Sequence, residues 1–308
     1  MARKRKGLPI HGWFNIDKPA GISSSNVVGR VRRATGAAKA GHGGTLDPLA
    51  TGVLPVALGE ATKTVSYAMD GTKVYRFNLC FGSATATDDT EGEIVEASNA
   101  RPGRDEIEGV LASFTGTIEQ VPPIYSAIMV DGCRAYELAR RDEPVELAPR
   151  EVRIDALSLL ETPDRDHAVF EVASGKGMYV RSLARDIARA LGTVGHIAWL
   201  RRTAVGAFKE NLANSLDKLE ALGHSAAASD LLLPVETVLA DIPALALTTQ
   251  EANRLRHGQG VAILPVACRS SFKDISQGDI ICAMADGKLV ALAKIAGGEI
   301  RPVRVMNF

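Results

Sequence analysis

The sequence predicts an α+β protein: a mixed, largely antiparallel central sheet with flanking helices, followed by a small C-terminal β-rich domain. Three observations support this fold class. Apolar and polar residues alternate in segments such as Arg150–Glu161 and His167–Ser174, as in half-buried strands that pair side by side. Helical periodicity appears elsewhere, as at residues 178–192. After Phe208 the composition changes, and the end of the chain contains short apolar runs separated by glycine turns.

The length and composition are those of a globular protein. The 308 residues, 46% of them apolar, suffice for one large domain or for a large and a small one. No apolar run approaches the ~18 to 20 residues that span a bilayer. Met1–Gly7 is basic, but no apolar stretch follows it, so we interpret it as a basic tail rather than a secretory signal.

Cysteine and histidine spacing gives no sign of a metal site. The four cysteines are far apart and form no C-x-x-C pair, and the six histidines show no ligand spacing. We therefore expect a cytoplasmic protein with free thiols, no metal and no cofactor.

The net charge is zero, but the charges are segregated along the chain. Residues 1–75 carry eleven Lys or Arg against four acids, and residues 176–209 carry seven against one. Residues 85–120 hold nine acids against two arginines. Clustered Lys and Arg bind phosphate backbones, so the folded chain could present one basic face to a nucleic acid. An ordinary solvated surface is the alternative.

Four elements are expected before residue 70. The first helix is predicted because Ser23 to Ser25 offer an N-cap and Gly36 offers a C-cap. In chain order the four are an apolar run at Trp13–Asp17, this helix within residues 21–36, a strand at Gly52–Leu58 and a short helix at Ala61–Met69.

The next part of the chain mixes strands and helices. The last helix would turn Leu183 and Ile187 inward and Arg185 and Arg189 outward. In chain order the expected elements are a strand at Lys73–Phe81, a helix at Asp105–Phe114, strands at Gly116–Gln120 and Ile124–Val130, a helix at Ala135–Arg141, the strand pair Arg150–Glu161 and His167–Ser174, and the helix within 178–192.

The C-terminal segment predicts a separate small domain. Prolines 234 and 243 mark a boundary, so we expect one domain at 10–236 and another at 242–308. The second would hold an amphipathic helix at Thr248–His257 and strands joined by turns at Asp286-Gly287 and Gly297-Gly298.

The loop Ala40–Pro55 holds four glycines, two prolines, one histidine and a single carboxylate, Asp47. Glycines allow a positive φ and close backbone approach, and Pro48 keeps Asp47 out of the helical region. One interpretation is that Asp47 caps a short helix beginning at Pro48. The other is that the loop admits a ligand and Asp47 acts on it.

The stretch GHGGTLDPLATGVLPVALGEATK, residues 41–63, resembles the signature of the bacterial tRNA pseudouridine-55 synthases, which isomerise one uridine in the T loop of transfer RNA. The similarity continues through KVYRF, PPIYSAIMVDGCRAYELAR, SGKGMYVRSLARDI and HIAWLRRTAVGAF. The resemblance implies a pseudouridine synthase fold over residues 10–236. It also implies an RNA-binding domain of the pseudouridine-synthase-and-archaeosine-transglycosylase type over residues 242–308.

The resemblance also implies roles for six residues. In the family the aspartate at Asp47 is catalytic, and an arginine at Arg181 pairs with it. A histidine at His42 fills the space that the extruded base leaves. The residues implied to contact the target nucleotide or line its pocket are Tyr75, Tyr179 and Leu200.

The residue patterns alone allow blander roles for most of these positions. Tyr75, Tyr179 and Leu200 would be core residues, and His42 an ordinary surface residue. Arg181 stands near a helix start, where the macrodipole favours anions, so an acidic partner or a phosphate accounts for it better. The family usually carries an aspartate where Ala86 stands here, whereas Asp89 matches.

The implied reaction needs no redox step and no group carrier. One carboxylate can serve as a covalent catalyst, and Asp47 could attack ribose C1′, attack uracil C6 or abstract a ribose proton. The uridine would have to be flipped out of its loop. The partner expected is the tRNA T arm, with no obligate protein partner. A non-catalytic RNA-binding or tRNA-folding protein is the alternative, and a nucleoside hydrolase a more distant one.

Overall fold

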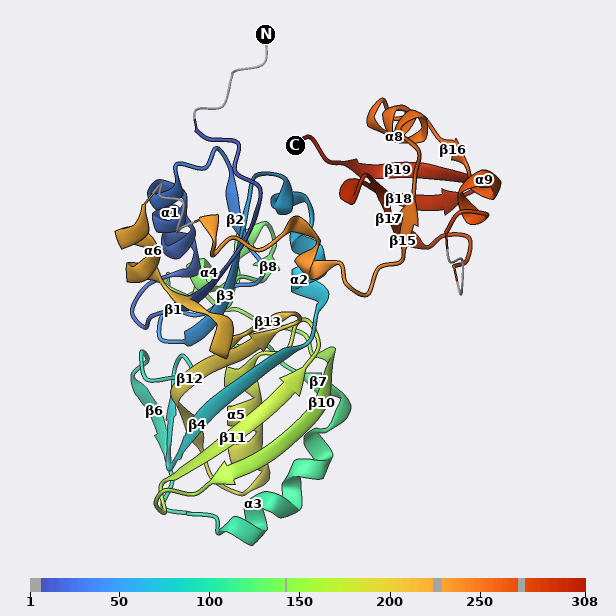
Figure 1. The fold of residues 1–308 in the computed structure, drawn as a ribbon. Helices are drawn as coiled ribbons and strands as arrows, with labels where there is room; N and C mark the ends of the chain where they lie inside the picture. The colour runs from blue at the N-terminus through green and yellow to red at the C-terminus, as the bar shows by residue number, and fades with distance from the viewer. Residues whose placement is uncertain (1–6, 142, 224–228, 271–274) are drawn as a thin grey trace.

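The computed structural model of the chain describes residues 7–141, 143–223, 229–270 and 275–308. Two large sheets organise them, one of ten strands and one of five (Figure 1). The expected fold class is confirmed: a mixed, mostly antiparallel central sheet with helices is followed by a separate C-terminal sheet. Residues 1–6 of the basic tail lie outside the described part of the chain.

The ten-stranded sheet has the order β14-β1-β3-β12-β4-β11-β10-β7, with β2 beside β3 and β13 beside β12. Its pairs are antiparallel except β1–β14 and β3–β12. The strands are β1 Gly12–Lys18, β2 Ala40–His42, β3 Thr51–Leu58, β4 Lys73–Phe81, β7 Gly116–Gln120, β10 Arg150–Glu161, β11 His167–Ser174, β12 Gly195–Val205, β13 Phe208–Lys209 and β14 Asn214–Ser215.

Helices cover the ten-stranded sheet. α5 packs against β12 and β4, and α1 packs against α6 (Figure 1). α1 begins and ends where the sequence predicts, because Ser23 Oγ accepts from Asn26 N and Gly36 takes a left-handed φ of 66°. The helices of this part are α1 Ser24–Thr35, α2 Val65–Asp70, α3 Arg104–Leu111, α4 Ala135–Ala139, α5 Val180–Ala190 and α6 Leu216–Leu222, with 3₁₀ turns at Gly59–Lys63, Ala112–Phe114, Glu210–Leu212 and Val235–Val238.

The strand expected at Ile124–Val130 is wrong. Only Met129–Val130 is extended, as β8, and it forms a two-strand hairpin with β9, Cys133–Arg134. The turn between them was predicted, with Asp131 and Gly132 at φ 48° and 86°. The rest of the segment bonds to the start of α4 instead of to a strand: the carbonyls of Ser126 and Ile128 accept from Tyr136 N and Ala135 N.

Two helix predictions near the loop also change. The helix expected at Ala61–Met69 is divided at Thr64, whose Oγ1 and backbone N–H both donate to Ala61 O and close a 3₁₀ turn before α2. No helix begins at Pro48: Ala50 N donates to Asp47 O at 3.1 Å, which closes a turn that does not continue. The capping interpretation of Asp47 is therefore wrong.

The strand β12 has no counterpart in the sequence-based expectations, although it lies between β3 and β4 inside the sheet. Its alternation is interrupted by irregularities between Ile197 and Trp199 and between Arg202 and Ala204. Such bulges shift the inward-facing positions, so the period of two is lost.

The five-stranded sheet has the order β15-β17-β18-β19-β16. Both predicted turns are present: Asp286-Gly287 joins β17 to β18 and Gly297-Gly298 joins β18 to β19, all four residues having positive φ. The elements are β15 Ala244–Ala246, α8 Thr249–Arg256, β16 Val261–Ala262, α9 Ile263–Ala267, β17 Ile280–Ala285, β18 Lys288–Ala296 and β19 Glu299–Val305.

Apolar contact joins the two sheets. One core cluster contains Trp13 and Val53 of the large sheet together with Leu289 and Leu292 of the small one. Further contacts join the chain end to the large domain: Lys63 Nζ donates to Val305 O at 2.6 Å. The C-terminal sheet is thus packed onto the larger one and not merely tethered to it.

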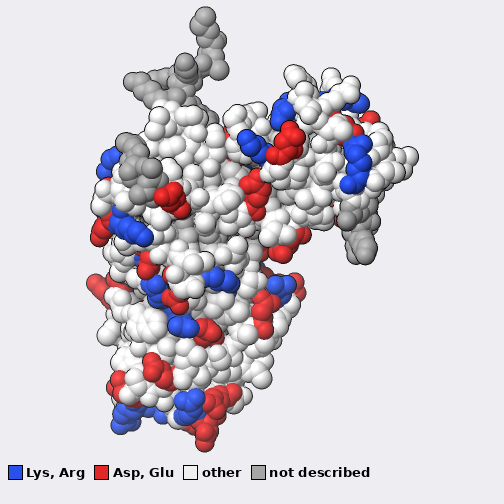
Figure 2. Space-filling view, in the orientation of Figure 1, with Lys and Arg blue, Asp and Glu red and all other residues white. Residues whose placement is uncertain are grey.

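The surface does not show a uniform charge on the face drawn in Figure 2. Lysine and arginine are interspersed there with aspartate and glutamate. Some of the charged side chains pair with each other, as in the salt bridges Arg201–Asp17 at 3.0 Å and Arg76–Glu171 at 2.8 Å. Within the described ranges, no helix has the length and apolar character needed to cross a membrane.

Candidate active site

Asp47 lies on the loop between β2 and β3. The backbone enters through Gly43, whose N–H donates to Pro55 O at 2.8 Å, and through Gly44 at φ 126°. Leu46 is fixed by Ser24, whose hydroxyl bridges its N–H and its carbonyl at 2.8 and 3.0 Å. The Asp47 side chain is 34% exposed, so a ligand can reach a carboxylate whose backbone is held.

Arg181, the second residue of α5, faces Asp47. Its Nε lies 3.0 Å from Asp47 Oδ2, and the side chain is only 5% exposed. The Nε–H does not form a directed hydrogen bond, so this contact is an ion pair. The two terminal nitrogens donate to backbone carbonyls, Nη1 to Thr87 and Nη2 to Tyr125, both at 3.0 Å. Arg181 thus joins three segments around the carboxylate instead of clasping it with both arms.

A second carboxylate, Asp89, stands on the other side of Arg181. Its Oδ2 is 3.8 Å from Arg181 Nη1, and the residue is 2% exposed. Asp89 Oδ1 accepts from Thr87 Oγ1 and Glu91 N at 2.5 and 3.0 Å. In the sequence Asp89 matches the family, but no site role was predicted for it; it lies in the turn between β5 (Ser83–Thr85) and β6 (Ile94–Ala97).

The same turn corrects the expectation for Arg185. We predicted that Arg185 faces outward, but its side chain is 14% exposed and its Nη1 lies 3.2 Å from Asp88 Oδ2. Burial raises the pKa of Asp88, and the Arg185 charge opposes that rise. The acidic turn and the basic helix therefore neutralise each other beside Asp47.

Lys18, at the end of β1, was not among the predicted site residues. Its ammonium donates to three backbone carbonyls, Pro19, Pro48 and Ala50, at 2.9, 3.0 and 2.7 Å. Burial lowers the pKa of Lys18 to about 8, while the Asp47 charge acts in the opposite direction. Lys18 thus holds the C-terminal side of the turn that carries Asp47.

Tyr75 and Leu200 lie on adjacent strands next to this loop. In the register of β4 and β12, Tyr75 is opposite Arg202 and Phe77 is opposite Leu200. Tyr75 is half-buried, Leu200 is 5% exposed, and the Arg202 guanidinium stands 6.0 Å from the Tyr75 ring centre. β3, which follows the Asp47 loop, also pairs with β12, since Thr51 is opposite Arg201.

His42 ends β2, opposite Val56 of β3. Its Nδ1 is buried without a hydrogen-bond partner. Burial lowers the pKa of His42, and the nearby Arg202 charge lowers it further. The imidazole is therefore mostly uncharged at pH 7.

Tyr179 is the residue directly before α5, two positions before Arg181 in the chain. Gln120 holds its backbone: Tyr179 N donates to Gln120 Oε1 at 2.8 Å, and Gln120 Nε2 donates to Tyr179 O at 3.2 Å. The Arg150 guanidinium lies 5.0 Å from the Tyr179 ring centre. Tyr179 thus lies next to both ends of the β7–β10 connection, Gln120 and Arg150.

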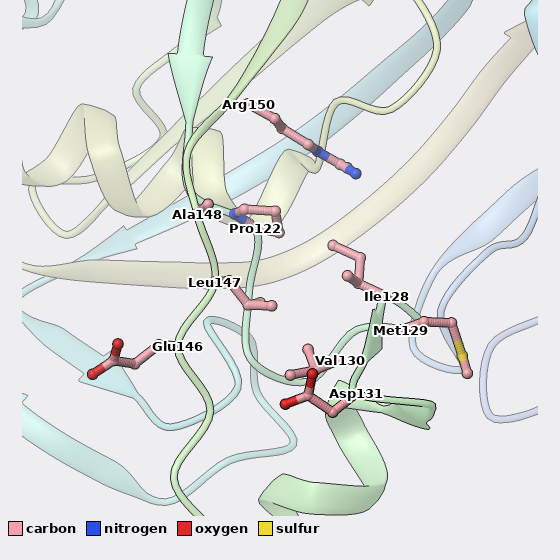
Figure 3. Close-up of a pocket in the computed structure, with 9 residues that line it drawn as sticks. All are labelled: Pro122, Ile128, Met129, Val130, Asp131, Glu146, Leu147, Ala148 and Arg150. Atoms are coloured by element: carbon pink, nitrogen blue, oxygen red, sulfur yellow. The ribbon is translucent and has the colours of Figure 1, made fainter.

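One hollow of about 380 Å³ opens beneath that connection (Figure 3). It borders Arg150 and so lies on the Tyr179 side of the site, and neither Asp47 nor Tyr75 lines it. Its lining is mixed, with two carboxylates and one guanidinium among apolar side chains: Pro122, Ile128, Met129, Val130, Asp131, Glu146, Leu147, Ala148 and Arg150.

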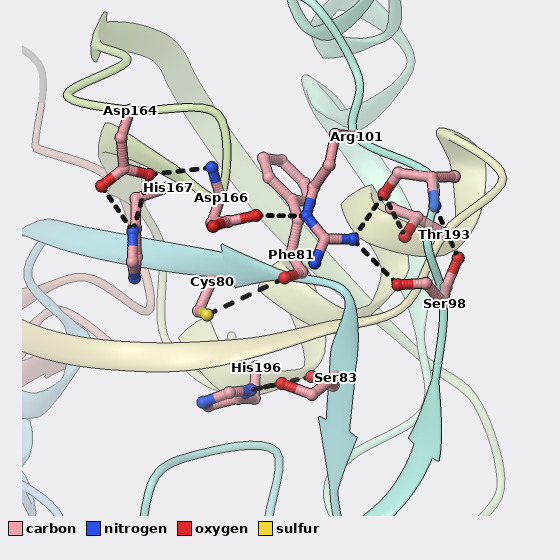
Figure 4. A network of polar contacts seen from close by, with 11 residues as sticks. Cys80, Phe81, Ser83, Ser98, Arg101, Asp164, Asp166, His167, Thr193 and His196 are labelled. Atoms are coloured by element: carbon pink, nitrogen blue, oxygen red, sulfur yellow. Dashed lines mark hydrogen bonds and ion pairs between the residues drawn. The ribbon is translucent and has the colours of Figure 1, made fainter.

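A polar cluster at another end of the sheet contains no predicted site residue (Figure 4). Arg101 pairs there with Asp166 and donates to Ser98 O and Ala100 O. His196 Nδ1 lies 2.8 Å from Ser83 O. These contacts close the ends of β4, β11 and β12, and we interpret the cluster as structural.

The comparison with solved structures gives the fold a precedent. The archaeal box H/ACA sRNP Nop10-Cbf5 complex contains a chain 25% identical to this one, with a TM-score of 0.73 and coverage of 99% of this chain and 92% of that one. A chain of a Cbf5-Nop10-Gar1 complex is 26% identical, with a TM-score of 0.75 and coverage of 100% and 90%.

Curated sequences give closer matches. A protein from Rhodospirillum rubrum named tRNA pseudouridine synthase B is 58% identical over 307 residues, covering 100% of both chains. One of the same name from Caulobacter sp. is 52% identical over 308 residues, covering 100% of this chain and 99% of that one. The family model of the TruB pseudouridylate synthase N-terminal domain matches residues 32–180, and that of the tRNA pseudouridylate synthase B C-terminal domain matches residues 181–240. The chain therefore belongs to the TruB family of pseudouridylate synthases.

Proposed function

We propose that this protein isomerises uridine to pseudouridine at position 55 in the T loop of tRNA, with Asp47 as the catalytic residue. The observation that carries the proposal is a partly exposed carboxylate, 3.0 Å from a buried guanidinium, on the loop that carries the family motif. A non-catalytic RNA-binding protein would need no carboxylate held in this way beside a neutralising cation.

Arg181 orients Asp47 and favours its ionised form, because an opposite charge at this distance stabilises the carboxylate. Asp89 holds Arg181 from the other side, 3.8 Å away. All three candidate routes, attack on ribose C1′, attack on uracil C6 and abstraction of a ribose proton, begin with an ionised Asp47.

Tyr75, Leu200 and Tyr179 form the pocket for the flipped uridine. Tyr75 offers a half-buried ring on which the base stacks, a contact worth ~1 to 3 kcal/mol. Leu200, beside it on β12, supplies an apolar wall. The neutral His42 ring takes the place of the extruded base and offsets part of the unstacking cost, which is of the order of a few kcal/mol.

The T arm of tRNA is the proposed partner, with no obligate protein partner. Residues 10–236 form the catalytic domain and residues 242–308 an RNA-binding domain that contacts the RNA beyond the pocket. The reaction uses no cofactor and takes place in the cytoplasm.

Mass mapping of a T-arm hairpin tests this function after incubation with the pure protein and treatment with a reagent that adds mass to pseudouridine alone, because the isomerisation itself leaves the mass of the RNA unchanged. Pseudouridine should appear at the uridine equivalent to position 55 and at no other uridine of the hairpin. A hairpin with cytidine at that position serves as the matched control and should remain unmodified. RNA that is bound but unmodified by the wild-type protein would favour the RNA-binding alternative.

A further inference from the structure

Arg202 of β12 is fully buried and donates to the loop that carries Asp47. Its side chain makes three hydrogen bonds to backbone carbonyls: Nε to Val53 at 2.8 Å, Nη1 to Thr45 at 3.2 Å and Nη2 to Gly44 at 3.0 Å. The residue is 1% exposed. These acceptors lie on both sides of Asp47 in the sequence, so one planar group holds both arms of the loop.

The strand that carries Arg202 is itself fixed. It pairs with β3 on one side, where Arg202 is opposite Gly52, and with β4 on the other, where Arg202 is opposite Tyr75. Gly52 has φ 99°, and a Cβ there would lie 2.2 Å from Arg202 O, so the close approach of β3 to β12 requires glycine. The guanidinium therefore fixes the position of the loop relative to β12, the strand that also carries Leu200.

The charge of Arg202 is not neutralised by a carboxylate. Within the described part of the chain, no carboxylate oxygen lies within 4.0 Å of its guanidinium. Buried arginines are usually paired with an acid. Here the charge instead acts on its surroundings: burial lowers the pKa of His42, Lys18 and Lys73, and the Arg202 charge acts in the same direction on all three.

We propose that Arg202 is a positioning residue for this reaction: its guanidinium holds the two arms of the Gly44–Val53 loop against β12 and thereby sets the Asp47 carboxylate relative to Tyr75 and Leu200. Lysine cannot replace it, because one ammonium does not present a rigid plane of donors to three separate carbonyls. This inference rests on the proposed function for its catalytic consequence, but not for the loop contact itself.

The test compares Arg202→Lys and Arg202→Gln with Arg201→Lys, which changes the preceding residue of β12, a half-exposed arginine paired with Asp17 and Glu210. Ile107→Val, at a buried position of α3, controls for a general loss of stability. Single-turnover pseudouridine formation and T-arm affinity are measured for each protein. Hydrogen exchange is followed in peptides from the loop and from β11.

We expect both Arg202 variants to lose about 100-fold in single-turnover rate, since a misplaced catalytic group costs of that order. RNA affinity should stay within about threefold, because phosphate and stacking contacts remain. The loop amides should exchange at least about tenfold faster while β11 stays protected, since local opening is independent of the core. Both controls should resemble the wild type.

Three results would overturn the proposal: a wild-type rate in Arg202→Lys, equal loss of exchange protection in the loop and in β11, or failure of both Arg202 variants to fold. The first result would mean that Arg202 is dispensable for the reaction. The other two would mean that it stabilises the whole fold and not the loop in particular. If the wild-type protein makes no pseudouridine, the proposed function fails instead. The exchange experiment then still decides whether Arg202 holds the loop.

Discussion

The charged side chains at the site differ in the fraction that is exposed to solvent. Asp47 is 34% exposed, whereas Arg181 is 5% and Asp89 3% exposed at the side chain. Arg181 donates to two backbone carbonyls and Asp89 accepts two hydrogen bonds, whereas the Asp47 carboxylate stays partly exposed. Substitutions should therefore separate chemistry at Asp47 from support at the residues behind it.

Asp47→Asn should abolish pseudouridine formation, because the amide lacks the charge and nucleophilicity that every candidate route needs. RNA affinity should change by less than roughly tenfold, or ~1.4 kcal/mol, since the contacts with the RNA are kept. Product yield at saturating enzyme and a binding titration check this. The preparation must be free of deamidated protein, and substantial turnover by the intact variant would end the case for Asp47.

Arg181→Lys should lower turnover by about 100-fold, since removal of one preorganised charged group costs of that order. Lysine keeps a charge near Asp47 but cannot also reach both Thr87 O and Tyr125 O. Arg189→Lys, an exposed residue of the same helix, is the matched control. Single-turnover rates of the two variants are compared, and near-wild-type activity of Arg181→Lys would show that the arginine serves another purpose.

Lys18 should make the free energy of unfolding depend on pH. An unfolded lysine titrates at 10.5 and folded Lys18 at about 8, so between these values the unfolded state binds more protons. The free energy of unfolding should therefore rise with pH across this window and be flat below it. Lys73, whose pKa burial also lowers to about 8, adds the same trend.

Urea titrations of the wild type and of Lys18→Met at pH ~7 and ~9.5 check this expectation. The variant should keep only about half of the rise, namely the share of Lys73. An unchanged rise in Lys18→Met would show that Lys18 titrates normally in the folded protein.

At the scale of elements, the site depends on the contact between β3 and β12. These two strands are parallel neighbours that come close only at Arg201 and Arg202, opposite Thr51 and Gly52. The loop of Asp47 enters β3 at this contact, and Leu200 immediately precedes it on β12. A change in the spacing of these strands would therefore move the carboxylate and the pocket wall relative to each other.

Gly52→Ala should destabilise the protein by at least ~2 kcal/mol, because the new Cβ meets Arg202 O and the backbone φ is unfavourable for alanine. Gly192→Ala is the matched control, with φ 70° and nothing within 4 Å of the added Cβ. It should cost about 1 kcal/mol, the strain alone. Denaturant unfolding compares them, and equal losses would mean that β3 can move away from β12.

At the scale of the whole molecule, the two sheets behave as one packed body. The core cluster shared by the two sheets runs from Trp13 and Val53 to Leu289 and Met306, and the ring of Phe308 lies 5.5 Å from that of His11. Val53 belongs to β3, which follows the Asp47 loop, and Trp13 belongs to β1, which pairs with β3. The C-terminal sheet thus packs against strands that lie next to the Asp47 loop.

A protein that ends at Asp241 should retain slow isomerisation of a short T-arm hairpin, because every candidate pocket residue precedes that point. Its melting temperature should fall, since the cut exposes the apolar cluster around Trp13. Calorimetry and single-turnover assays on the purified fragment check both expectations. Complete inactivity of a folded fragment would contradict the division into domains at 236 and 242.

The sequence by itself determined the elements whose signals are local. The caps of α1, the strands β10 and β11, the Asp131-Gly132 turn and the two glycine turns of the small sheet were predicted, because each depends on residues close together in the chain. The motif around Asp47 likewise indicated both the family and the residues to examine.

Tertiary structure alone decided what surrounds Asp47. Nothing local in the sequence shows that Lys18 and Arg202 are buried, since their partners are backbone carbonyls contributed by other segments. The Asp47–Arg181 pair was implied by the family resemblance, but the approach of Asp89 to the same arginine was not. β12 was missed because its bulges remove the alternation by which strands are recognised. Local patterns report backbone preference, whereas the surroundings of a charge depend on which segments the completed sheet brings together.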